Sequence, residues 1–289
     1  MKLKGARALI TGANQGLGLA VAKAFAAEGA RVLLCARDGE KLRTAAAEVA
    51  AVATSKDAVR TRVADVAKAE DCQALADEAR SAWGGLDVCV ANAGIYGPIG
   101  PFEENDLGHW VEALNVNLLG VVHTCRAVVP GMKAAKKGKI VVLGGGGATK
   151  GMPAFSAYAA SKAGAVRFAE TIALELEPSG VAVNVVAPGA LNTRLLDEVL
   201  AAGPEKAGAD FHARSRKQQA SGGDSPERAA ALCVFLASSA SDGITGKLIS
   251  ARWDPWEELP TRLDDLRRTD VYTLRRIVPA ERGMTWGGA

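Results

Sequence analysis

Short apolar runs rich in β-branched residues alternate with longer segments of helical periodicity over the first 250 residues of the chain. A continuous apolar run is typical of a buried parallel strand, because helices cover both faces of such a sheet. We predict strands at 6–10, 31–35, 58–63, 86–90, 139–143, 181–186 and 247–250, and helices at 17–28, 39–53, 68–83, 105–135, 155–177 and 226–238. The alternation predicts an α/β fold: one domain with a doubly wound parallel sheet of seven strands, in the order 3-2-1-4-5-6-7.

Two regions depart from this rhythm. The segment 195–225 is mixed in charge and ends in glycine and serine, which is typical either of a lid over a substrate site or of a plain surface insertion. The segment 251–289 contains Trp253, Trp256 and Trp286, and it is too short and too polar for a second domain. We predict that residues 1–250 form the domain and that 251–289 is an extension packing on it or on a neighbouring subunit. Its tryptophans either close a site or only pack.

The composition indicates a globular protein, with 48% apolar and 23% charged residues. The net charge of +3 favours no nucleic-acid partner, and the lysines between 133 and 139 are typical of a solvated loop. Five scattered cysteines in apolar runs predict buried free thiols, and the three histidines lack the spacing of metal ligands. We find no signal peptide and no apolar run of about 18 residues, so we expect a cytoplasmic protein without a membrane span or a metal.

A glycine-rich turn follows the first predicted strand and begins the first predicted helix. The sequence there is TGANQGLG, from Thr11 to Gly18. Glycines at such a turn let the backbone approach a pyrophosphate, and the free amides at the start of the helix attract its negative charge. This context predicts a dinucleotide site that includes Gly12, Asn14, Gln15, Gly16, Leu17 and Gly18.

A tyrosine and a lysine stand four residues apart in the predicted helix 155–177. This spacing puts Tyr158 and Lys162 on the same helix face, one turn apart. A nearby ammonium group favours the phenolate form of a tyrosine, whose reference pKa is about 10. The pair is therefore suited to acid/base chemistry on an alcohol or a carbonyl.

Five motifs in register resemble the short-chain dehydrogenase/reductase family over about residues 5–250. They are the glycine-rich turn, Asp65, the triplet Asn92-Ala93-Gly94, the Tyr158/Lys162 pair, and Pro188-Gly189 with Thr193. The resemblance implies a Rossmann fold, a homodimer or homotetramer, and hydride transfer between a carbonyl and a secondary alcohol with an NAD(P) cofactor. It further implies that Lys162 holds the nicotinamide ribose and that an asparagine positions a relay water, for which Asn117 is a better match than Asn115. The residues that would also contact the cofactor are Asp65, Val66, Asn92, Ala93, Gly94, Pro188, Gly189 and Thr193.

The end of the second strand bears on the choice of cofactor. A carboxylate there would bind the ribose 2′-hydroxyl of NAD, and Ala36 occupies that position in register with the family. Arg37 follows, and it either binds a 2′-phosphate with its forked guanidinium or only stacks on adenine. Gln15 stands where NADP-preferring members often have a second basic residue. We expect NADP(H) to be favoured over NAD(H).

Four glycines, Gly144 to Gly147, mark a departure from the family. Its third catalytic group is a serine thirteen residues before the tyrosine, and here this position is Gly145. Gly144, Gly145 and Gly146 are the candidate substrate contacts.

Three hypotheses follow from this departure. The enzyme transfers hydride with a glycine amide, a water or a side chain of the lid or tail polarising the substrate oxygen. Alternatively, the glycines make room for a bulky sugar or polyketide-like substrate of an epimerase or dehydratase that uses hydride transiently. The third hypothesis is a non-catalytic NADP(H)-binding regulatory or assembly subunit. The retained Tyr158, Lys162 and Asn117 favour the two catalytic hypotheses.

Overall fold

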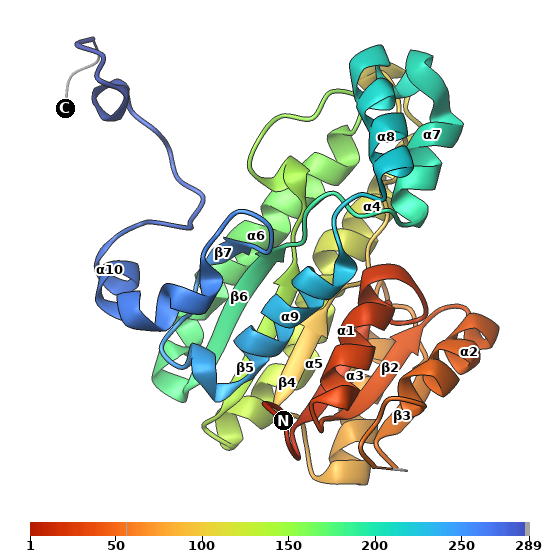
Figure 1. The fold of residues 1–289 in the computed structure, drawn as a ribbon, viewed down its shortest axis with the longest axis vertical. Coiled ribbons are helices and arrows are strands. Elements are labelled where there is room, and N and C mark those ends of the chain that lie inside the picture. Colours follow the sequence, from red (N-terminus) through yellow and green to blue (C-terminus); the bar gives the residue numbers. More distant parts are fainter. Residues whose placement is uncertain (56, 287–289) are drawn as a thin grey trace.

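The computed structural model describes residues 1–55 and 57–286 of the chain. Within them, parallel strands form one seven-stranded sheet in the order β3-β2-β1-β4-β5-β6-β7 (Figure 1). The predicted fold class and strand order are thus confirmed. The strands are β1 (Arg7–Thr11), β2 (Arg31–Ala36), β3 (Val59–Val63), β4 (Val88–Ala91), β5 (Gly138–Leu143), β6 (Val181–Ala187) and β7 (Leu248–Ser250).

Helices cover both faces of the sheet. One layer contains α1 (Gly16–Ala27), α2 (Gly39–Ala50) and α9 (Pro226–Ala237), and the other contains α3 (Ala69–Trp83), α5 (Gly120–Ala134) and α6 (Ser156–Leu176). Successive strand residues face opposite layers, so Ala8 and Ile10 belong to the first apolar core and Leu9 to the second. This double burial explains why the central strands are mostly apolar, whereas the edge strand β3 is largely exposed and carries Arg60, Thr61 and Arg62.

The long helix predicted at 105–135 is interrupted in the middle. It consists of α4 (Leu107–Leu114), a π-helical turn (Asn115–Leu119) and α5. A π-helical turn inserts an extra residue into a helix and is frequent at functional sites. Asn117 lies in this turn and is fully buried, so the interruption sets the position of a residue predicted to be catalytic.

The predicted insertion 195–225 contains a pair of packed helices. They are α7 (Arg194–Ala207), which is kinked at Gly203, and α8 (Ala209–Ser221). Val199 and Ala207 of α7 pack with Phe155 and Tyr158, and Phe211 of α8 lies edge-on to Phe155 with ring centroids 5.0 Å apart. The helix pair therefore covers the N-terminal end of α6.

The C-terminal segment divides into two parts. Trp256 packs on Phe235 of α9, with ring centroids 5.4 Å apart, and the short helix α10 (Leu263–Arg268) adds Leu266 to the same core. The chain still lies on the domain at Tyr272 and Leu274: the Leu248 amide donates to the Tyr272 carbonyl oxygen (2.7 Å), and the Leu274 amide donates to Glu170 Oε1 (2.7 Å). Beyond Leu274 the chain runs away from the domain (Figure 1), and there Trp286 is exposed. Trp253 is also exposed. Of the three tryptophans, Trp256 alone is therefore buried.

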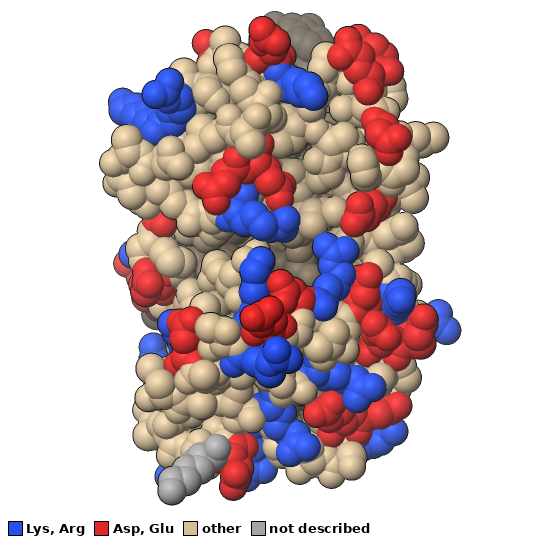
Figure 2. All heavy atoms as spheres, turned by 90° about the vertical axis from the view of Figure 1, so that its right-hand side faces the viewer, with Lys and Arg blue, Asp and Glu red and all other residues tan. Residues whose placement is uncertain are grey.

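Among residues 1–55 and 57–286, no helix is both long enough and apolar enough to cross a membrane. Acidic and basic side chains are interspersed on the face drawn in Figure 2. All five cysteines are buried as free thiols, as the apolar runs around them predict.

We predict that two helical glycines respond oppositely to alanine. A Cβ at Gly18 in α1 would lie 2.2 Å from the carbonyl oxygen of Gly12, whereas a Cβ at Gly131 in α5 meets nothing within 4 Å. Gly18→Ala should lower the free energy of unfolding by about 1–3 kcal/mol through overpacking. Gly131→Ala should raise it by about 0.5–1 kcal/mol through helix propensity. Urea titration measures both, and equal stability of the two variants would refute this packing.

Candidate active site

A cleft of about 2020 Å³ lies at the carboxyl ends of the strands and collects the predicted site residues. Asn117 is the exception, because it is buried behind the wall of the cleft. Strands β1 and β4 are neighbours although β2 follows β1 in the sequence, so the cleft lies at the switch point where doubly wound sheets bind ligands. The predicted residues that line it are Gly12, Asn14, Gln15, Gly16, Leu17, Gly18, Arg37, Asp65, Val66, Asn92, Ala93, Gly94, Gly144, Gly145, Gly146, Tyr158, Lys162, Pro188, Gly189 and Thr193.

The glycine-rich turn forms a cradle for a diphosphate. Gly12 and Gly16 have φ values of +63° and +54°, which side chains rarely adopt. Gln15, the N-cap of α1, makes no side-chain capping bond. The turn therefore offers backbone amides and the positive end of the helix dipole to the cleft, which suits the pyrophosphate of a dinucleotide.

Asn92 fixes this turn from the neighbouring strand. Its Nδ2 atom donates to the carbonyl oxygens of Thr11 (2.9 Å) and Gly12 (3.1 Å). In return, Thr11 Oγ1 accepts hydrogen bonds from the backbone amides of Asn92 (3.0 Å) and Ala93 (3.1 Å). The sequence analysis missed Thr11, although its place at the end of the first strand was a signal. Its hydroxyl joins the carboxyl ends of β1 and β4.

Two cations line the cleft beyond the end of β2. Arg37 is about half exposed and lies 3.5 Å from Glu112, measured from Nη1 to Oε1. Lys41, four residues later in α2, lines the same region, and sequence reasoning missed it. Asp38 accepts hydrogen bonds from the amides of Glu40 and Lys41 and so caps α2.

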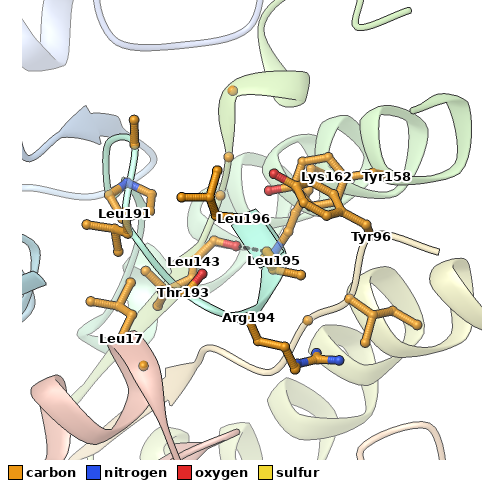
Figure 3. Close-up of a pocket in the computed structure, with 18 of the residues that line it drawn as sticks. Leu17, Tyr96, Leu143, Tyr158, Lys162, Leu191, Thr193, Arg194, Leu195 and Leu196 are labelled. Atoms are coloured by element: carbon orange, nitrogen blue, oxygen red, sulfur yellow. Dashed lines mark hydrogen bonds between the residues drawn. The ribbon is translucent and has the colours of Figure 1, made fainter. Parts of the chain in front are cut away.

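Tyr158 and Lys162 project from one face of α6 into the cleft (Figure 3). Lys162 Nζ donates a 2.7 Å hydrogen bond to the carbonyl oxygen of Leu143 and lies 6.0 Å from the centroid of the Tyr158 ring. Burial lowers the pKa of Lys162 to about 8. The ammonium form is therefore close to losing its proton near neutral pH.

An aromatic cluster encloses the Tyr158 ring. Tyr96, from the loop after β4, lies edge-on to it with ring centroids 4.7 Å apart, and Phe155 packs alongside. Burial, together with Tyr96, raises the pKa of Tyr158. The charge of Lys162 alone would lower the pKa of Tyr158. The pKa is raised instead, because Lys162 is hydrogen-bonded to the Leu143 carbonyl oxygen and because burial disfavours the charged phenolate.

The Asn117 side chain ties three segments together. Its Oδ1 atom accepts a hydrogen bond from the Ile95 amide (2.9 Å), and Nδ2 donates to the Ile95 carbonyl oxygen (2.8 Å) and to Ser161 Oγ (2.9 Å). Both amide protons are therefore used, and Oδ1 keeps one lone pair. Gly94 lies between this oxygen and Lys162, since a Cβ there would be 3.2 Å from Oδ1 and 3.4 Å from Nζ.

The four glycines differ in their surroundings. A Cβ at Gly144 would press on Val185 at 3.0 Å, one at Gly147 would lie 2.9 Å from the Cα of Ala159, and one at Gly146 meets nothing within 4 Å. Gly145 has extended backbone angles that any residue adopts. A Cβ at Gly145 would lie 2.2 Å from the Tyr158 hydroxyl oxygen, so the missing side chain leaves room for the tyrosine.

Known proteins identify the family of this chain. The model of the short chain dehydrogenase family matches residues 6–202, so the chain belongs to this family. D-beta-hydroxybutyrate dehydrogenase of Cupriavidus necator is 33% identical over 256 residues, which are 85% of this chain and 96% of that protein.

Two solved structures share the fold and bind nicotinamide cofactors. NAD⁺-bound xylitol dehydrogenase superposes with a TM-score of 0.79 at 26% identity, covering 86% of this chain and 98% of that one. Gluconate 5-dehydrogenase from Burkholderia cenocepacia, in complex with NADP and tartrate, has a TM-score of 0.75 at 29% identity, with 86% and 94% covered. Together with the diphosphate cradle, these similarities make the chain an NAD(P)-dependent dehydrogenase.

We predict that the buried charge of Lys162 costs stability. Its pKa is about 8 in the folded protein against an ordinary value of 10.5, so the unfolded chain binds more protons in this window and wild-type stability rises with pH through it. Lys162→Met should raise the free energy of unfolding near neutral pH by about 1–2 kcal/mol, after subtraction of the lost hydrogen bond.

The gain should shrink as the pH rises from about 8 to 10.5, as measured by urea titration at several pH values. Lys133→Met, at an exposed position of α5, is the matched control and should show no such dependence. A Lys162→Met protein less stable than wild type at neutral pH would refute the prediction.

Proposed function

We propose that this dehydrogenase interconverts a carbonyl and a secondary alcohol, with Tyr158 as the acid/base and NADP(H) as the favoured cofactor. The observation that carries the proposal is the shared position of three features in one cleft. The Tyr158 hydroxyl, the Lys162 ammonium and the diphosphate cradle all line it. A cofactor bound along the cradle would extend toward the tyrosine, where a substrate oxygen needs a proton.

The proposed proton transfer follows from the state of Tyr158. A bound reduced nicotinamide supplies a hydride to the carbonyl carbon, and the oxidised form accepts one from the alcohol. In reduction, the carbonyl oxygen takes the proton of the Tyr158 hydroxyl. Because the pKa of Tyr158 is raised, the phenol is protonated at neutral pH and suited to this step. Alcohol oxidation, which needs the phenolate, should accelerate as the pH rises.

Lys162 and Asn117 support this transfer in the proposed mechanism. Lys162 holds the nicotinamide ribose, and its ammonium charge stabilises the phenolate left after proton donation. The free lone pair of Asn117 Oδ1 serves to hold a relay water that returns a proton toward Lys162. Substrate contacts are assigned to Gly144, Gly145 and Gly146, of which Gly146 has open space for a substrate group.

The first test uses a panel of ketones and aldehydes with NADPH, and of alcohols and sugars with NADP, followed by the absorbance of the reduced nicotinamide. Tyr158→Phe should lower the rate by about 10²- to 10⁴-fold, because it removes the transferable proton. Tyr272→Phe, at a tyrosine outside the cleft lining, should leave the rate unchanged.

Three outcomes contradict the proposal. Turnover that survives in Tyr158→Phe would remove the tyrosine from the chemistry. Cofactor binding without turnover of any panel member would favour the non-catalytic binding subunit. A product with changed stereochemistry or loss of water, without net change in the cofactor, would favour the epimerase or dehydratase alternative.

The cofactor preference depends on Arg37. Charge-assisted hydrogen bonds contribute about 1.5–3 kcal/mol, so Arg37→Ala should weaken NADPH binding about 10- to 100-fold and leave NADH binding nearly unchanged. Lys41→Ala should have a smaller effect of the same kind. Arg43→Ala, an exposed residue of α2 outside the cleft lining, is the matched control. Titration calorimetry measures both affinities, and equal losses for NADPH and NADH would contradict the assignment.

A further inference from the structure

The cleft lacks a hydroxyl group at the position that faces Tyr158 from the end of β5. Gly145 stands there, and a Cβ on it would lie 2.2 Å from the Tyr158 oxygen. A substrate carbonyl that receives a proton from Tyr158 gains from a second donor on its oxygen, because negative charge develops there during hydride transfer. A second donor for this oxygen must therefore come from another part of the cleft.

Tyr96 presents a hydroxyl group at this place. Its ring is edge-on to Tyr158 with centroids 4.7 Å apart, and both side chains line the cleft. In Figure 3 the hydroxyl ends of the two rings lie on the same side. Neither hydroxyl makes a hydrogen bond to any residue that the structure describes, so both are free to bind a ligand oxygen.

Tyr96 is also held rigidly. The preceding residue, Ile95, is bound at both its amide and its carbonyl oxygen by the buried Asn117. The ring is fixed by Phe155 at a centroid distance of 5.1 Å and by Tyr158. Donors that are fixed before the substrate binds need no reorganisation during the reaction, which makes them effective in stabilising a developing charge.

The geometry points to Tyr96 as a second catalytic residue, whose hydroxyl donates a hydrogen bond to the substrate oxygen that Tyr158 protonates. This inference rests on the proposed function, and it assigns to Tyr96 the hydrogen-bond donor that Gly145 does not supply. Tyr96 acts only as a hydrogen-bond donor, so the proton that is transferred comes from Tyr158. The donor comes from the loop after β4, and not from the β5 end where the glycines lie.

The test compares Tyr96→Phe with wild type on the substrate that the panel identifies. The substitution keeps the ring contacts and removes the hydroxyl. We expect kcat to fall by about 10²-fold, the usual cost of one such donor, with cofactor affinity and unfolding midpoint unchanged. Because the hydride step becomes slower, the isotope effect with NADPH deuterated at the transferred position should increase. Tyr272→Phe is the matched control and should behave as wild type.

Each outcome bears on the inference. A wild-type kcat in Tyr96→Phe, with activity lost in Tyr158→Phe, would overturn the role of Tyr96 alone. Full activity in Tyr158→Phe, or no turnover by wild type, would overturn the proposed function and this inference with it. A Tyr96→Phe profile that keeps its maximal rate and only shifts between about pH 6 and 9 would make Tyr96 a modulator of Tyr158, and would overturn it too.

Discussion

The reciprocal hydrogen bonds between Thr11 and Asn92 are the constraint on which the site depends. Strands β1 and β4 pair side by side, but the loops that follow them lead to different helices, so chain connectivity does not hold one loop against the other. The Thr11 hydroxyl accepts from two amides after β4, and the Asn92 side chain donates to two carbonyls after β1. The glycine-rich turn is thereby fixed to the loop that leads to Gly94, Ile95 and Tyr96, so the end of the cleft at the turn is tied to the end that holds Tyr158.

A second set of hydrogen bonds, deeper in the molecule, also ties the loop after β4 to another element. Asn117, in its π-helical turn, binds the backbone of Ile95 and the hydroxyl of Ser161. Ser161 lies beside Lys162 in α6, so one buried amide group links the loop after β4 to helix α6. Sites built on such rigid elements hold their reacting groups in place before a ligand arrives.

The four glycines from Gly144 to Gly147 differ in the space around them. A Cβ at Gly147 would clash with the backbone of Ala159 and one at Gly144 would press on the Val185 side chain, whereas Gly146 is open. Gly145 is different, because the space that its side chain would take holds the Tyr158 hydroxyl. The absence of a side chain at Gly145 thus coincides with close packing of Tyr158, and the aromatic cluster of Tyr96, Phe155 and Phe211 surrounds that tyrosine.

The pattern of apolar runs was enough to predict the sheet, its strand order and the covering helices, because double burial and right-handed crossovers leave few alternatives. The five motifs were enough to indicate the family and the residues of one cleft. Tertiary structure alone decided the partners of buried polar groups: Thr11 with Asn92, Asn117 with Ile95, and Lys162 with Leu143. It also decided that Tyr96 lies against Tyr158. Such contacts join segments far apart in the chain, and local sequence carries no record of which groups meet when the strands come together.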